Sequence, residues 1–126
     1  RLLWRLSHQP PPLPAVYPRW ERLAAHTAHV ALYVLIIALP FSGLLLDSAW
    51  KFAPEVKMYW FGLFEWPRID FIMQLEPGLK KQLHHLFGEI HESLAFVLIG
   101  LWVVHVGAAL KHQFIDKHAE LQRMLP

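Results

Sequence analysis

The sequence predicts an all-α fold, specifically a transmembrane helical bundle. Hydrophobic residues make up 55% of its 126 residues and charged residues only 17%, whereas soluble domains are about 45–50% apolar. Two stretches, 30–46 and 94–110, are almost wholly apolar, and each approaches the roughly 20 residues that a helix needs to cross a bilayer. We therefore expect two full spanning helices in this chain.

The amino-acid composition further narrows the class of protein and its possible ligands. Six Trp, eight Phe and three Tyr fit a membrane protein with aromatic belts at its interfaces. The formal charge of +2 is too small to argue for a nucleic-acid partner. The chain has no Cys, which excludes disulfides, iron–sulfur ligation and thioether attachment of haem. Its nine His are therefore the main candidates for metal ligands.

The first part of this single predicted domain contains one spanning helix. Residues 1–6 resemble the end of a helix that begins upstream, and because the chain opens without Met we expect preceding sequence. Residues 7–18 hold four closely spaced prolines, which favour an extended linker. The first spanning helix is predicted at 19–46, bent at Pro40. Ser42 and Gly43 offer it a surface for close helix packing.

The second part contains the other spanning helix. Residues 47–78 mix aromatic and polar side chains, as expected of a loop in the headgroup region, with one short helix near 69–75. Pro77 and Gly78 then break the chain. The second spanning helix is predicted at 79–111, and an amphipathic tail at 112–126 follows it along the membrane surface.

Two histidines of the second spanning helix are the candidate metal ligands, His91 and His105. They are fourteen residues apart, which places them within about 40° of one face and about 21 Å apart along the helix axis. An ionisable side chain inside a span is costly and so suggests function, and imidazole is a standard axial ligand of haem. The alternatives are a hydrogen bond from His105 to a neighbouring helix and a solvated His91 at the membrane edge.

Three further features of the sequence bear on this site. In an antiparallel pair His29 would lie near the depth of His105, so that these two could bind one haem between them. His91 has no such partner, and its opposite ligand would have to come from outside this sequence. His112 continues the stripe just beyond the membrane, where a surface histidine is the commoner outcome. Glu89 and Glu92 would orient His91 through hydrogen bonds or be solvated.

The distribution of basic residues predicts the orientation. Seven Lys and Arg lie near the termini and five in the connecting loop, a modest bias that favours cytoplasmic termini. His105 would then lie toward the cytoplasm and His91 toward the outside.

Four stretches together resemble the bacterial cytochrome b561 family of four-helix, di-haem membrane proteins. The most specific is HESLAFVLIGLWVVH at 91–105; the others are RLLWRLSHQPPPLP at 1–14, AAHTAHVALYVLIIALPFSGLLL at 24–46 and LQRMLP at the end. The resemblance implies an inner-membrane protein with two b-type haems in its full-length form. His91 and His105 would supply one axial ligand each. Two further helices, or another subunit, would supply the opposite ligands.

The resemblance also bears on the remaining histidines and on function. It argues against the pairing of His29 with His105, because the family's third helix is not the usual ligand donor, and it places His26 and His29 in the interior or in a quinone pocket. His112 would lie near the cytoplasmic haem edge. The predicted function is electron transfer between ubiquinone and a second redox partner. As an enzyme, the protein would at most be a superoxide:ubiquinone oxidoreductase.

Basic side chains of the outer loop would suit an anionic donor, although five acidic residues in the same loop offset them on average. The candidate side chains are Lys51, Lys57, Arg68, Lys80 and Lys81. The alternatives are a cytochrome b anchor subunit of a hydrogenase or formate dehydrogenase complex, and a haem-free membrane module.

Overall fold

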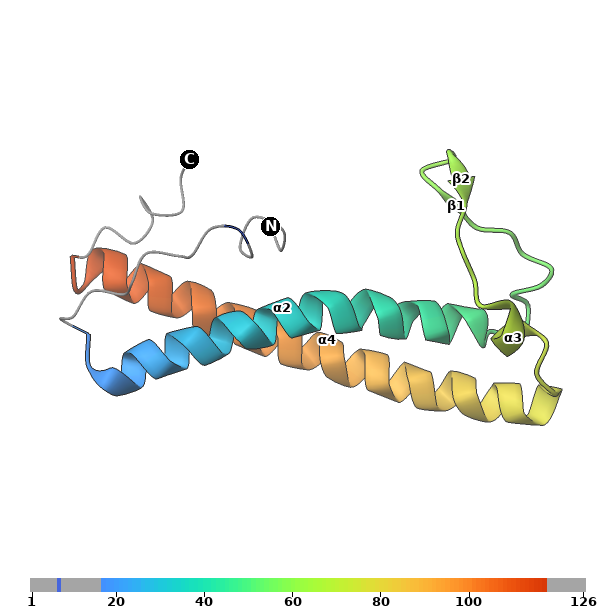
Figure 1. Cartoon of the computed structure of the whole chain (residues 1–126), viewed down its shortest axis with the longest axis horizontal. Coiled ribbons are helices and arrows are strands. Elements are labelled where there is room, and N and C mark those ends of the chain that lie inside the picture. The colour runs from blue at the N-terminus through green and yellow to red at the C-terminus, as the bar shows by residue number, and fades with distance from the viewer. Residues whose placement is uncertain (1–6, 8–16, 118–126) are drawn as a thin grey trace.

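The chain is built on two long antiparallel helices. The computed structural model describes Ser7 and residues 17–117. Figure 1 shows the two helices side by side, crossing near their middles, with the connecting loop projecting from one end of the pair. Both helices are long and apolar enough to cross a membrane, which confirms the predicted fold class. The elements are α2 (Arg19–Ser48), β1 (Tyr59–Trp60), β2 (Phe64–Glu65), α3 (Asp70–Met73) and α4 (Pro77–Phe114).

The helix boundaries differ slightly from the predicted ones. Helix α2 ends at Ser48 rather than at 46, and α4 runs from Pro77 to Phe114 rather than from 79 to 111. Pro77 does not break the chain but begins α4, because proline at the first helical position has a suitable φ and lacks only an N–H that would have no helical partner there. The predictions for residues 1–6, for most of the linker and for the end of the tail lie outside the described residues.

Glu76 caps the start of α4 and provides a pH-dependent contact. Its carboxylate accepts hydrogen bonds from the backbone N–H groups of Gly78 and Leu79, at 2.9 and 3.1 Å, and these bonds lower the pKa of Glu76 below its ordinary value of 4.5. A lowered pKa means that the cap is fully present above the unfolded-state pKa and is lost as pH falls through the folded-state pKa. We expect hydrogen exchange at these two amides, corrected for its intrinsic pH dependence, to accelerate below pH 4.5. E76Q should abolish this dependence on pH, whereas identical profiles would contradict the capping role.

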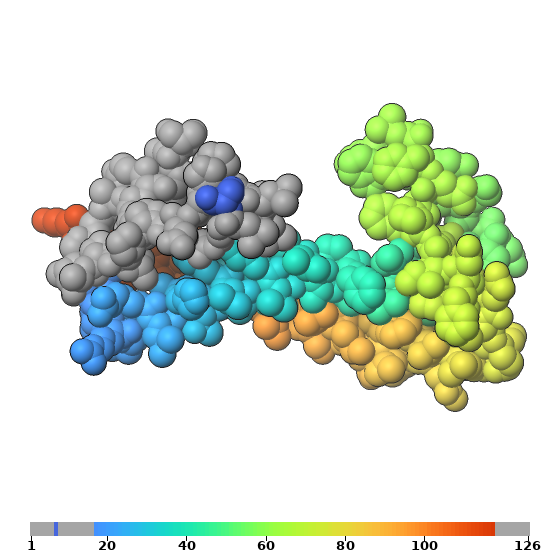
Figure 2. All heavy atoms as spheres, in the orientation of Figure 1, coloured from blue at the N-terminus to red at the C-terminus, as the bar shows by residue number. Residues whose placement is uncertain are grey.

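The two helices pack along one stripe of α4. A side chain at Gly88 would meet Leu46 Cδ1 at 3.7 Å, and at the other end Lys111 Nζ lies 3.8 Å from Glu21 Oε1. Among the described residues, none in the most apolar 18-residue window of α4 is fully buried. Figure 2 shows the pair as a narrow rod rather than a closed bundle. These apolar flanks fit contact with lipid or with further helices.

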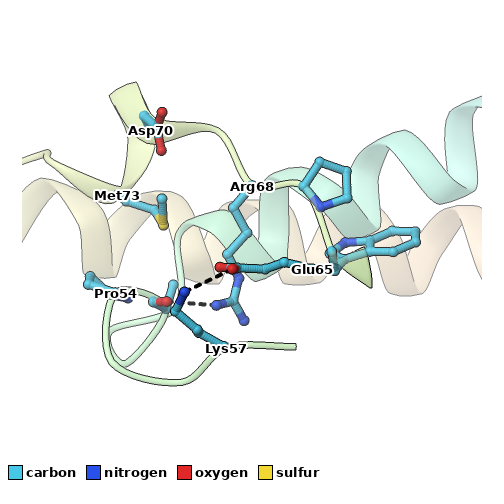
Figure 3. A pocket seen from close by; sticks show the side chains of 9 residues that line it. Pro54, Lys57, Glu65, Arg68, Asp70 and Met73 are labelled. Carbon is cyan, nitrogen blue, oxygen red and sulfur yellow. Dashed lines mark hydrogen bonds and ion pairs between the residues drawn. The ribbon is translucent and has the colours of Figure 1, made fainter. Parts of the chain in front are cut away.

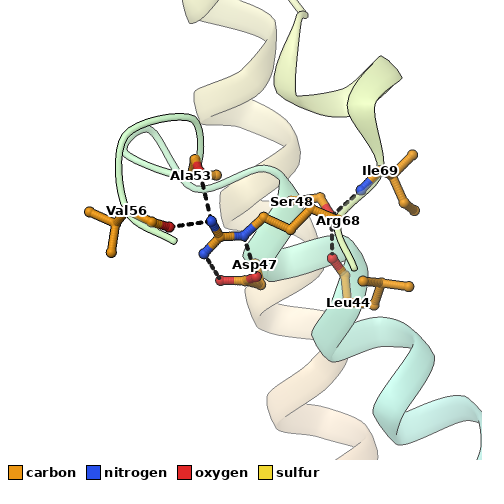
Figure 4. A network of polar contacts seen from close by, with 7 residues as sticks. All are labelled: Leu44, Asp47, Ser48, Ala53, Val56, Arg68 and Ile69. Atoms are coloured by element: carbon orange, nitrogen blue, oxygen red, sulfur yellow. Dashed lines mark hydrogen bonds and ion pairs between the residues drawn. The ribbon is translucent and has the colours of Figure 1, made fainter. Parts of the chain in front are cut away.

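The loop is tied to the end of α2 by a polar network (Figure 4). The Arg68 guanidinium binds both carboxylate oxygens of Asp47, with Nε to Oδ2 at 2.7 Å and Nη2 to Oδ1 at 3.2 Å. It also donates to the carbonyl oxygens of Ala53 and Val56. The Ser48 hydroxyl accepts from the Ile69 N–H at 3.0 Å. This network fixes the loop at the His91 end of the helix pair.

Candidate functional site

The histidine stripe of α4 faces α2. His84, His91, Leu98, His105 and His112 are all partly buried, while their neighbours on the opposite side of the helix are exposed. The period of seven residues keeps these positions on one face of the helix. The predicted stripe is therefore the contact face of α4, and neither candidate ligand points away from the other helix.

His91 is held against α2 at Ser42 and Gly43. Its Nδ1 lies 2.9 Å from the Ser42 Oγ. A Cβ built on Gly43 would lie 3.2 Å from the His91 Cε1, closer than carbon atoms normally approach each other, so the ring lies directly on the glycine. The small-residue surface predicted for α2 is thus the surface that receives the candidate ligand.

His105 lies against His29 of α2. Their ring centroids are 5.2 Å apart and the rings meet edge to face at 66°. This is direct aromatic contact. Antiparallel packing therefore brings His29 and His105 to the same depth, as predicted.

His112 belongs to a polar cluster at the end of α4. Its Nδ1 lies 2.7 Å from the Asp116 Oδ2, and its ring centroid is 4.8 Å from that of Tyr17. Asp116 also accepts a hydrogen bond from Lys111 Nζ at 2.8 Å. The bond from Lys111, followed by that from His112, lowers the pKa of Asp116. Asp116 is therefore a carboxylate at neutral pH, and His112 is oriented rather than freely solvated.

The basic side chains of the loop divide between two hollows. The first, of about 320 Å³, is lined by residues of the loop and includes the ion pair of Lys57 with Glu65 (Figure 3). Its other basic residue, Arg68, is paired with Asp47 (Figure 4). The second, of about 690 Å³, lies where the loop meets α4; the described residues that line it include Lys51, Lys80, Lys81 and His84 but no carboxylate. Carboxylates therefore line the first hollow but are not among the described residues that line the second.

Comparison with known proteins identifies the family to which the chain belongs. A family model described as prokaryotic cytochrome b561 matches residues 1–126. The chain belongs to the prokaryotic cytochrome b561 family. It is 39% identical to cytochrome b561 homolog 2 of Escherichia coli K12 over 99% of this chain and 61% of that protein. It is 29% identical to cytochrome b561 homolog 1 of the same organism over 100% of this chain and 65% of that protein. The chain thus spans less than two thirds of either relative, and no solved structure matches it.

The cytochrome b561 family consists of prokaryotic membrane proteins that bind haem b, and the described residues suit such a group. They contain no cluster of three or more His, Cys, Asp or Glu able to hold a bare metal ion. Haem iron, held by its macrocycle, needs only axial ligands from the protein. The separated imidazoles of His91 and His105, on one face of α4, are the candidates for such ligands.

Sequence reasoning missed the group that orients His91. Glu89 is exposed and lies 3.5 Å from His85, and Glu92 is exposed as well, so these carboxylates follow the solvated alternative. The orienting group is Ser42, on the other helix. Its sequence signal was a small hydroxyl residue inside an apolar run, which indicates close packing as readily as a hydrogen bond.

Proposed function

We propose that this cytochrome b561 chain supplies one axial ligand to each of two b-type haems, through His91 and His105, and that the protein carries electrons across the membrane. The observation that carries the proposal is the single stripe of α4, where both imidazoles lie against α2 at opposite depths. When bound, such haems accept and release single electrons. The opposite ligands would come from helices outside this sequence.

The second hollow supports an anionic electron donor at the outer end. Lys51, Lys80 and Lys81 gather there without a lining carboxylate, and a cationic recess concentrates anions. His84 lines this hollow and lies two helical turns, about 10 Å, before His91. Superoxide is the donor that the resemblance suggests: two superoxide anions would each lose one electron and become O₂.

The cluster at the other end supports a quinone acceptor. Ubiquinone would take the two electrons together with two protons and become ubiquinol. His112, held by Asp116 at 2.7 Å, is placed just beyond the apolar part of α4, where it could hydrogen-bond a quinone carbonyl and pass it a proton. In this proposal the termini and His105 face the cytoplasm across the bacterial inner membrane.

The test uses the full-length protein, reconstituted with ubiquinone and a superoxide source. We expect a Soret band and ubiquinol formation. The double variant K51Q/K81Q should slow reduction by about tenfold at low ionic strength, and the difference should shrink in high salt. K57Q is the matched control, because Lys57 lines the other hollow and is already paired with Glu65.

Two results would contradict this function. A protein without a Soret band, even after haem supplementation, would exclude electron transfer through haem. A double variant that is reduced as fast as the K57Q control would exclude the second hollow as the site of an anionic donor.

A further inference from the structure

Ser42 has a buried hydroxyl with two partners. The residue is only 5% exposed. Its Oγ lies 2.8 Å from the Leu39 carbonyl oxygen, within α2, and 2.9 Å from His91 Nδ1, across the helix interface. It is therefore both anchored to its own helix and in contact with a candidate haem ligand.

The proton count assigns direction to these two bonds. A hydroxyl has one hydrogen, and a carbonyl oxygen can only accept. With the Ser42 hydrogen donated to the Leu39 carbonyl, we assign the bond to His91 with Nδ1–H as donor and the serine oxygen as acceptor. A neutral imidazole protonated at Nδ1 has its lone pair on Nε2, the atom then available to a metal.

Gly43 provides the second contact that holds the His91 ring. A Cβ built on Gly43 would lie 3.2 Å from Cε1, 3.6 Å from Nδ1 and 4.0 Å from Nε2 of His91, so a side chain at this position would require the ring to shift by a few tenths of an ångström. The ring is thus held by a hydrogen bond at Nδ1 and by contact of its edge with the glycine. Both constraints come from adjacent residues of one helix.

We propose that Ser42 and Gly43 are positioning residues: by holding the Nδ1 side of the His91 ring against α2, they would leave Nε2 as the nitrogen that binds haem iron, and they would set the potential of that haem. This inference rests on the proposed function. Histidine ligands commonly donate their second N–H to a fixed acceptor, and that bond raises the electron donation of the ring. A neutral hydroxyl raises it less than a carboxylate would.

Ser42→Ala removes the acceptor without adding bulk. The less electron-rich imidazole should stabilise ferric iron less, so the midpoint potential of the His91 haem should rise, and its affinity for haem should fall by about tenfold. The haem held by His105 should keep its potential and serves as a control inside the same molecule. Ser42→Thr, which keeps a hydroxyl, should restore the original potential.

Gly43→Ala tests the steric half of the proposal. The new methyl group should shift the His91 ring and weaken the binding of the haem there, leaving the His105 haem in place. Gly88→Ala is the matched control on the same interface, because its methyl group would meet only the flexible end of Leu46 at 3.7 Å. We expect this control to keep both haems.

The outcomes separate this inference from the function on which it rests. If H91A loses a haem but S42A leaves both potentials and the haem affinity unchanged, Ser42 does not position His91. If G43A keeps the His91 haem as fully as G88A, close contact with Gly43 does not position the His91 ring. If H91A itself loses no haem, the ligand assignment fails, and the positioning role fails with it.

Discussion

His91→Ala and His105→Ala are each expected to remove one haem from the full-length protein, about half of the total, and the double variant should remove nearly all of it. An axial ligand lost from a six-coordinate haem leaves the iron held from one side only. The two effects should be independent, because the residues lie about four helical turns apart. Haem per protein, measured as the pyridine haemochrome, gives the count.

A redox titration of each single variant assigns each midpoint potential to one of the two haems. H91A should retain only the potential of the haem bound through His105, and H105A only that of the haem bound through His91. His85→Ala is the control, because its side chain is 76% exposed and paired with Glu89. Full haem content in both H91A and H105A would show that these two histidines are not the axial ligands.

The two long helices could be predicted from sequence because their signal is local. An apolar run of membrane-spanning length has few other structures open to it. The small differences at the ends arise where apolarity stops being informative: Ser48 extends α2 by bonding the Leu44 carbonyl at 2.7 Å, and Pro77 begins α4 under the cap of Glu76. Neither effect follows from hydropathy.

The hairpin of β1 and β2 was not predicted, for a specific reason. Its turn uses positive φ at Phe61 and Gly62, 48° and 74°. Such turns usually carry Asn-Gly or Asp-Gly; with phenylalanine in the first position, the segment has the composition of an interfacial stretch. The only residue in this turn that indicates a hairpin from sequence is therefore Gly62.

Only part of the candidate haem site could be predicted from the sequence. The period of the histidines fixed their common face, since that depends on helix geometry alone. The contact between Ser42 and His91 joins residues 49 positions apart, so it depends on the register of α2 against α4, which no local pattern gives. The contact of Arg68 with Asp47 likewise joins distant residues. The sequence indicates only a cation in the loop, whereas the structure shows it bound at the end of α2.

Arg68→Ala is expected to be the most destabilising loop substitution, lowering the free energy of unfolding by about 2 kcal/mol. The Arg68 side chain is only 7% exposed and that of Asp47 23%. Removing the guanidinium leaves the Asp47 carboxylate near the negative end of the α2 dipole and removes the donor to the Ala53 and Val56 carbonyls. Arg68→Lys should recover only part of the loss, since an ammonium cannot bind both carboxylate oxygens in the same plane.

Thermal loss of the Soret band in detergent measures the effect, with an expected fall in midpoint of about 4–8 °C for R68A. Lys57→Ala is the matched control from the same loop. Its ion pair with Glu65 is similarly short, 2.9 Å, but the side chains are 64% and 51% exposed, so its removal should leave the midpoint unchanged. Hydrogen exchange at the Ile69 amide, which is bonded to Ser48, gives a local reading and should accelerate in R68A only. If R68A and K57A behave alike in both measurements, the loop is not held to α2 through Arg68, and the second hollow, which the same loop walls, would lose its fixed place beside His84.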